Sequence, residues 1–100
     1  MSPKDSEFAD DLRVMAERAL GELPSPYGPR VMEDVWIQIE NHAGLLENYK
    51  LFCAMKGQET VNGKIGDLTR TLTGYVDADS MPTTRTHLAE SYTVLVPPEA

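Results

Sequence analysis

Apolar residues recur every three or four positions along much of this 100-residue chain, the spacing of helices with one buried face. In the first such stretch, Ser2 offers a helix cap, and Gly21 and Pro24 are stop signals. Its apolar stripe consists of Phe8, Leu12, Met15 and Ala19. The second stripe consists of Val31, Met32, Val35, Trp36 and Ile39. We therefore predict a helix within residues 1–23 and another over residues 30–41.

The stretch from Leu45 to Gly74 has the clearest pattern, because two apolar stripes flank a short break at Gly57. The first stripe consists of Leu45, Tyr49, Phe52, Cys53 and Met55. The second consists of Val61, Ile65, Leu68 and Leu72. Asn62-Gly63 is a common hairpin dipeptide, but the residues around it do not alternate as strands do. Two helices joined by a turn are therefore predicted, with a small hairpin near Asn62-Gly63 as the alternative.

The remaining segments are connectors and a last short helix. Residues 24–29 are rich in proline and are predicted to form a hinge after the first helix. Residues 75–82 are polar and predict a loop. The helical spacing of Leu88, Tyr92 and Leu95 predicts a final helix, and residues 96–100 form a tail.

Together these elements predict a single domain over residues 1–100, with a helical core at residues 30–95. The predicted fold class is all-α, a compact bundle of four to five short helices. The alternative is an α+β fold with a small hairpin near Asn62-Gly63.

Charge is distributed unevenly along the chain, whose formal net charge is −7. Residues 1–49 contain ten acidic and four basic side chains, whereas residues 50–85 contain four acidic and five basic ones. Asp10, Asp11 and Glu17 share the polar face of the first predicted helix. An acidic surface of this kind favours a basic partner and disfavours nucleic acid and membranes.

Cysteine content and hydropathy bear on location. The single cysteine, Cys53, excludes a disulfide within one chain and is typical of a reducing compartment. No apolar run approaches the roughly 20 residues that cross a bilayer, and the first residues do not resemble a signal peptide. We therefore expect a cytoplasmic protein that does not bind membranes.

Catalytic and metal-binding patterns are weak. Cys53 has His42 and His87 as possible partners, without a local signature around any of them. Asp77 begins a segment that resembles a calcium loop, but the sixth position is Pro82 and the twelfth is Leu88, neither of which fits. We predict no catalytic residue, cofactor or metal site, and therefore no enzymatic activity.

The second helix of the central pair has a polar face that could contact DNA. Asn62 and Arg70 are residue types that read base edges, whereas Lys64 and Thr71 are types that hold phosphates. In shape, residues 45–74 resemble the helix–turn–helix of transcriptional regulators, with Gly57 in the turn. That resemblance implies a DNA-binding regulator that would act as a homodimer.

The acidic balance of the chain favours a different function. We expect a small non-enzymatic regulatory protein, an inhibitor or adaptor, that binds a basic protein surface through Asp10, Asp11 and Glu17. DNA binding through Asn62, Lys64, Arg70 and Thr71 is the alternative.

Overall fold

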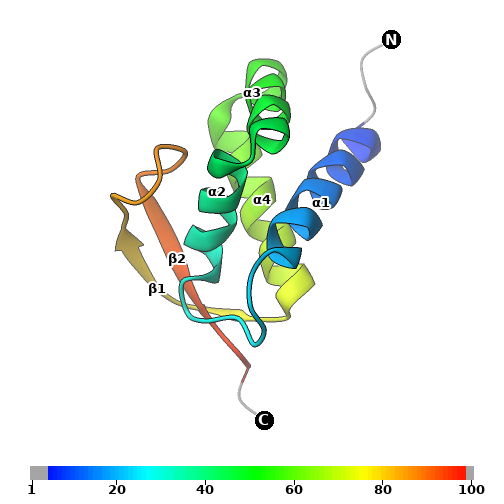
Figure 1. Ribbon diagram of the computed structural model, residues 1–100. Helices are drawn as coiled ribbons and strands as arrows, with labels where there is room; N and C mark the ends of the chain where they lie inside the picture. Colours follow the sequence, from blue (N-terminus) through cyan, green and yellow to red (C-terminus); the bar gives the residue numbers. More distant parts are fainter. Residues whose placement is uncertain (1–4, 99–100) are drawn as a thin grey trace.

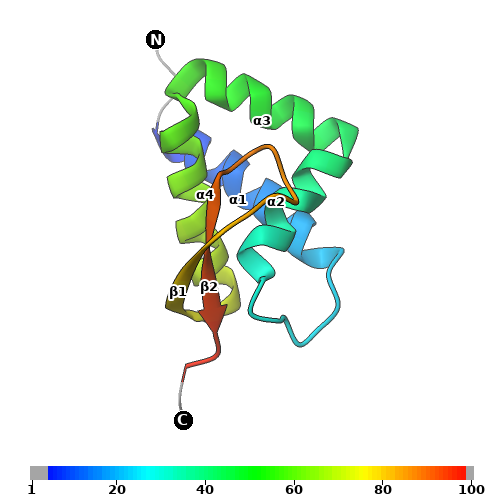
Figure 2. The same cartoon turned by 90° about the vertical axis from the view of Figure 1, so that its left-hand side faces the viewer.

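The computed structural model describes residues 5–98 of the chain, with side chains from Asp10 onward. Four helices are followed by a two-stranded antiparallel sheet, and the hairpin lies across the face formed by α2 and α4 (Figures 1 and 2). The elements are α1 (Asp5–Gly21), α2 (Val31–Asn41), α3 (Ala43–Lys56), α4 (Gln58–Thr73), β1 (Val76–Pro82) and β2 (Ser91–Val96).

The four helices form where the apolar stripes predict them, and the stripes meet in one core. Leu12, Met15 and Ala19 of α1 are buried, as are all five predicted residues of α2. Of the predicted stripe of α3, Leu45 and Tyr49 are buried, while Met55 is 53% exposed and was wrongly assigned to the core. The predicted cap at Ser2 and the side chain of Phe8 lie outside the described part of the chain.

The break between α3 and α4 is a single residue, Gly57, at φ 91° and ψ 144°. Residues that carry a side chain rarely adopt this backbone conformation, so glycine suits the position. Helix α4 then continues without interruption through Asn62 and Gly63, so the alternative hairpin at that dipeptide is wrong. It ends at Gly74, whose φ of 73° is the left-handed conformation common after helices.

The all-α prediction is only partly correct, because the C-terminal part of the chain forms a hairpin. Residues 75–82, predicted to be a loop, contain β1, and the predicted last helix is a loop followed by β2. The α+β alternative therefore fits the fold class, although the hairpin lies at residues 76–96. Leu88, Tyr92 and Leu95 are nevertheless all buried, so the apolar spacing located the core residues but not their secondary structure.

Two carboxylates of α2 hold the hairpin loop against that helix. Glu33, a buried acid, accepts a hydrogen bond from Thr83 and pairs with Arg85 at 2.7 Å. About two turns further along α2, Glu40 accepts hydrogen bonds from the backbone N–H of His87 and the hydroxyl of Thr86. Polar side chains of α2 thus hold the loop whose Leu88 is buried in the core.

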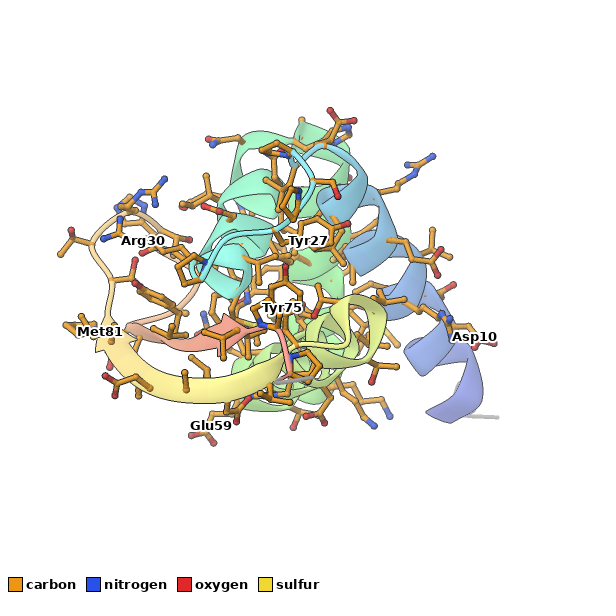
Figure 3. The ribbon with its side chains drawn as sticks, turned by 90° about the horizontal axis from the view of Figure 1, so that it is seen from below. Asp10, Tyr27, Arg30, Glu59, Tyr75 and Met81 are labelled. Carbon is orange, nitrogen blue, oxygen red and sulfur yellow. The ribbon has the colours of Figure 1, made fainter. Side chains whose placement is uncertain are left out.

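The proline-rich segment is held at two points. The Tyr75 hydroxyl donates to the Tyr27 carbonyl at 2.8 Å, and the two rings meet edge to face (Figure 3). The N–H of Leu95 donates to the Pro29 carbonyl at 3.2 Å. These contacts tie residues 27–29 to the residue before β1 and to the last part of β2. They restrict the motion that a hinge would need.

Among the helices of residues 5–98, none is both long and apolar enough to cross a membrane.

Candidate functional site

Exposed apolar side chains gather between α1 and α3. Five large apolar residues are exposed in the described chain, and three of them, Val14, Leu51 and Met55, are each more than half exposed. These three line one groove of about 390 Å³, together with Met15, Leu45 and Phe52. Its polar rim consists of Asp11, Arg18 and Asn48. Soluble proteins rarely expose clustered apolar side chains without a binding role, so this groove is the leading candidate site.

Helix geometry explains why Leu51 and Met55 are exposed. At 100° per residue, they lie roughly 80–120° to one side of Leu45, next to the buried stripe of α3 rather than within it. The apolar surface of α3 is therefore wider than the core covers. Sequence reasoning missed the groove because Met55 was included in the buried stripe and Val14 and Leu51 were not singled out. An apolar stripe wider than a helix needs for its core was the available signal.

The acidic residues predicted to bind a partner surround Val14. Asp10, Asp11 and Glu17 are all exposed on α1. On the helical wheel Asp10 and Glu17 lie about 20° apart on one side of Val14, and Asp11 lies on the other side. Glu17 pairs with Arg13 at 3.0 Å, but both side chains are more than half exposed, so this pair adds little stability. Of the predicted acids, Asp11 therefore lines the groove, as does the basic Arg18, whereas Asp10 and Glu17 lie on the other side of Val14.

Two of the residues predicted to contact DNA have partners within the fold. Asn62 accepts a hydrogen bond from the Tyr49 hydroxyl at 2.7 Å and donates to the Leu88 carbonyl at 2.8 Å. Arg70 pairs with Asp77 of β1 at 2.6 Å, and more loosely with Asp67 at 3.4 Å. The hairpin thus covers this side of α4.

The other two predicted DNA contacts lie on the outer side of α4. The Thr71 hydroxyl donates to the carbonyl of Asp67 one turn earlier. Lys64 is exposed and forms no ion pair with a described residue. The structure therefore does not gather the four predicted residues on one open face.

The Leu88 carbonyl is the centre of a polar cluster between α3, α4 and the hairpin loop. Besides the amide of Asn62, the side-chain amide of Gln58 donates to it at 3.1 Å and the hydroxyl of Tyr49 at 3.3 Å. Burial raises the pKa of the Tyr49 hydroxyl to about 12. A neutral hydroxyl that donates hydrogen bonds stabilises the loop, and we assign the cluster a structural role.

The candidate catalytic residues have separate positions. The Nδ1 atom of His42 accepts a hydrogen bond from the backbone N–H of Leu45 and so caps α3. Cys53 is half-buried on the same helix, roughly 16–17 Å further along its axis at 1.5 Å per residue. His87 is almost fully exposed, beside Glu40. Within residues 5–98, no three His, Cys, Asp or Glu side chains are grouped closely enough to hold a metal ion.

No family model, curated protein or solved structure matches this chain. The chemistry of its surfaces is therefore the basis on which a function can be proposed.

Proposed function

We propose that this chain is a small non-enzymatic protein-binding module, acting as an inhibitor or adaptor, which binds a basic amphipathic helix in the groove between α1 and α3. The observation that carries the proposal is the gathering of Val14, Leu51 and Met55 in that one groove, each more than half exposed. Apolar side chains of a partner helix, spaced three or four residues apart, would remove this surface from water.

The charge around the groove supports a basic partner. Asp11 lines the groove, Asp10 and Glu17 lie on α1 on the other side of Val14, and the whole chain has a net charge of −7, although Arg18 also lines the groove. Lysine and arginine side chains that flank the apolar residues of a partner helix would face these carboxylates. A second copy of this chain would instead bring two sets of acids together, which disfavours a homodimer at this surface.

DNA binding has less support than protein binding. Asn62 and Arg70 would have to leave their partners Leu88, Asp67 and Asp77 before they could contact a groove of DNA. Breaking such contacts costs free energy that a DNA complex would have to offset. The acidic surface of the chain would also repel phosphates.

A labelled model helix tests the proposal. The probe is an 18-residue peptide of leucine and lysine with leucines at helical spacing, and binding is followed by fluorescence anisotropy. Replacing both Leu51 and Met55 by glutamine keeps good helix formers on α3 but makes the groove polar. We expect the affinity of this variant to fall by roughly tenfold or more. Met81→Gln is the matched control, because Met81 is exposed on β1, on the other side of the molecule from Asp10 (Figure 3).

Charge variants test the electrostatic part of the proposal. Replacing Asp10, Asp11 and Glu17 by lysine should weaken binding of the leucine–lysine peptide with little change in stability, because exposed charges contribute little to folding. Lys64→Glu should leave binding unchanged.

Three results would contradict the proposal. The first is equal affinity of the wild type and the Leu51/Met55 variant for the peptide. The second is dimerisation of the wild type that the Leu51/Met55 variant abolishes, which would identify a second copy as the occupant. The third is salt-sensitive binding of duplex DNA that Lys64→Glu abolishes, which would favour the DNA-binding alternative.

A further inference from the structure

A second and larger groove, of about 570 Å³, lies between α4 and the segment that leads into β2. Its volume is within the range of ligand-binding pockets. Met32 and Trp36 of α2 line it, as do Gly63 and Gly66 of α4 on one side and Ser91 and Thr93 of β2 on the other. It shares no lining residue with the groove between α1 and α3.

One edge of β2 borders this groove and is not paired with β1. In an antiparallel pair, the backbone groups of successive residues point alternately toward and away from the partner strand. The N–H of Leu95 points away from β1, because it donates to the Pro29 carbonyl. The carbonyl of Glu90 points toward the other arm of the hairpin, because it accepts from the N–H of Thr83. Both contacts place the N–H and C=O groups of Ser91 and Thr93 on the edge away from β1.

The pairing of β1 with β2 supports this assignment. Ser91 lies opposite Pro82, which has no N–H to donate across the pair. The bulge between Asp77 and Asp79 adds its extra residue to β1, so the alternation along β2 is not interrupted. Backbone groups at an unpaired sheet edge are the groups to which an added strand hydrogen-bonds.

A side chain that lines the same groove has a buried hydrogen-bond donor without a partner. Trp36 is 6% exposed, and its Nε1 is a buried side-chain nitrogen without a hydrogen-bond partner in the described structure. A buried N–H that lacks an acceptor is costly. A backbone carbonyl of a bound peptide would supply such an acceptor.

Beside Gly63 the wall formed by α4 leaves room for a ligand. A methyl group added at Gly63 would meet no atom within 4 Å. The space beside Gly66 is instead filled by Arg70 and Met32, and Arg70 reaches the Thr93 hydroxyl at 3.5 Å.

The rim of the groove is acidic. Glu59 and Glu90 also line the groove, and neither forms an ion pair with a described residue. Arg70, the basic residue of the lining, is paired with Asp77 and Asp67. The uncompensated charge is therefore negative and complements a basic side chain.

We propose that this groove binds an extended peptide segment of a partner protein, which adds a third strand beside Ser91 and Thr93 and carries at least one basic residue. A peptide carbonyl accepts a hydrogen bond from Trp36 Nε1, and the basic residue lies near Glu59 and Glu90. The site is independent of the groove between α1 and α3, so either binding function can fail without the other.

A library of displayed random heptapeptides is the probe, selected on the full-length chain. Gly63→Leu adds a side chain to the open wall of α4 and should reduce the affinity of selected peptides by roughly tenfold or more. Gly63→Ala is the matched control, because a methyl group meets no neighbour, and it should bind as the wild type does. The selected peptides should be enriched in lysine or arginine.

Amide and indole NMR signals locate the bound peptide. The chain has one tryptophan, so a single indole N–H signal reports on Trp36. We expect this signal and the amide signals of Ser91 and Thr93 to shift in a saturable way when the strongest selected heptapeptide is added. A version of that peptide methylated at alternate backbone nitrogens should bind at least roughly tenfold more weakly, because it cannot complete the strand pairing.

Any of the following outcomes would overturn the proposal. No heptapeptide is enriched on the wild type, or the enriched peptides bind Gly63→Leu equally well. A further contradicting outcome is that the amides that shift belong to Ala78 and Ser80 of β1 while the indole signal of Trp36 does not move. Finally, Ser91 and Thr93 become protected from exchange as protein concentration rises without peptide, which would identify a second copy at this edge.

Discussion

Tyr49 joins three parts of the fold through its hydroxyl, which contacts Asn62 and Gln58 of α4 and the Leu88 carbonyl. Burial is the main cause that raises its pKa from 10.0 to about 12. In the unfolded chain the hydroxyl ionises near pH 10, whereas in the folded chain it stays neutral to about pH 12. The unfolded state therefore binds fewer protons between these values.

The free energy of unfolding should consequently be unaffected by Tyr49 below pH 10 and fall as pH rises from 10 to 12. Urea unfolding of the wild type and Tyr49→Phe, measured at several pH values, checks this. Tyr49→Phe should cost about 1 kcal/mol at neutral pH and lose less stability above pH 10. Parallel pH profiles for the two proteins would show that Tyr49 is not responsible.

Gly57 and Gly63, two glycines of the central helical pair, should respond differently to replacement by alanine. Gly57 has a positive φ of 91°, whereas Gly63 lies within α4 with open space beside it. Gly57→Ala should therefore destabilise the chain by about 1–3 kcal/mol. Gly63→Ala should stabilise it by up to about 1 kcal/mol, since alanine favours helix. Thermal unfolding of both variants tests this contrast, and equal changes in their melting temperatures would contradict it.

The structural roles of single residues were predictable from the sequence where neighbouring residues alone determine them. Gly57 and Gly74 end helices because of backbone conformation, which their place after an apolar stripe indicates. The partners Leu88 of Asn62 and Asp77 of Arg70 were not predictable, because they lie on a hairpin more distant in sequence.

Helix α1 is the element whose packing bears most directly on the hinge prediction. The proline-rich segment was expected to act as a hinge, yet Leu12, Met15 and Leu20 of α1 are buried in the common core. Burial of three such side chains stabilises by roughly 5–9 kcal/mol, which is comparable to the total stability of many domains.

We therefore expect a chain that begins at Pro29 to lose cooperative urea unfolding, followed by circular dichroism. A chain shortened at the other end, lacking residues 97–100, should keep it, because Pro97 and Pro98 are exposed. If the chain from Pro29 unfolded with a steep single transition, α1 would be separable and the hinge interpretation would hold.

The hairpin could not be predicted from the same periodicity that located the helices. All residues of β1 are exposed, so that strand has no alternation of buried and exposed positions to detect. In β2, Tyr92 and Leu95 are buried three positions apart, which mimics helical spacing in a strongly twisted ribbon. The density of Thr93, Val94 and Val96 was the available strand signal.

For the whole molecule, charge and apolar surface meet on α1 and α3. The acidic character of α1 was evident from the sequence, but the groove beside it depends on how α3 packs against α1. Packing of this kind is a tertiary property, and composition alone did not distinguish Leu51 from the residues of the core. The sequence therefore predicted the sign of the surface but not its apolar centre.

The central claim is that the groove between α1 and α3 is the partner-binding surface, and amide chemical-shift mapping tests it most directly. The wild-type chain is titrated with the leucine–lysine helix. We expect saturable shifts at residues 11–18 of α1 and residues 45–55 of α3, with residues 62–71 of α4 unchanged. Shifts confined to residues 62–71, or no saturable shift in α1 and α3, would contradict the account.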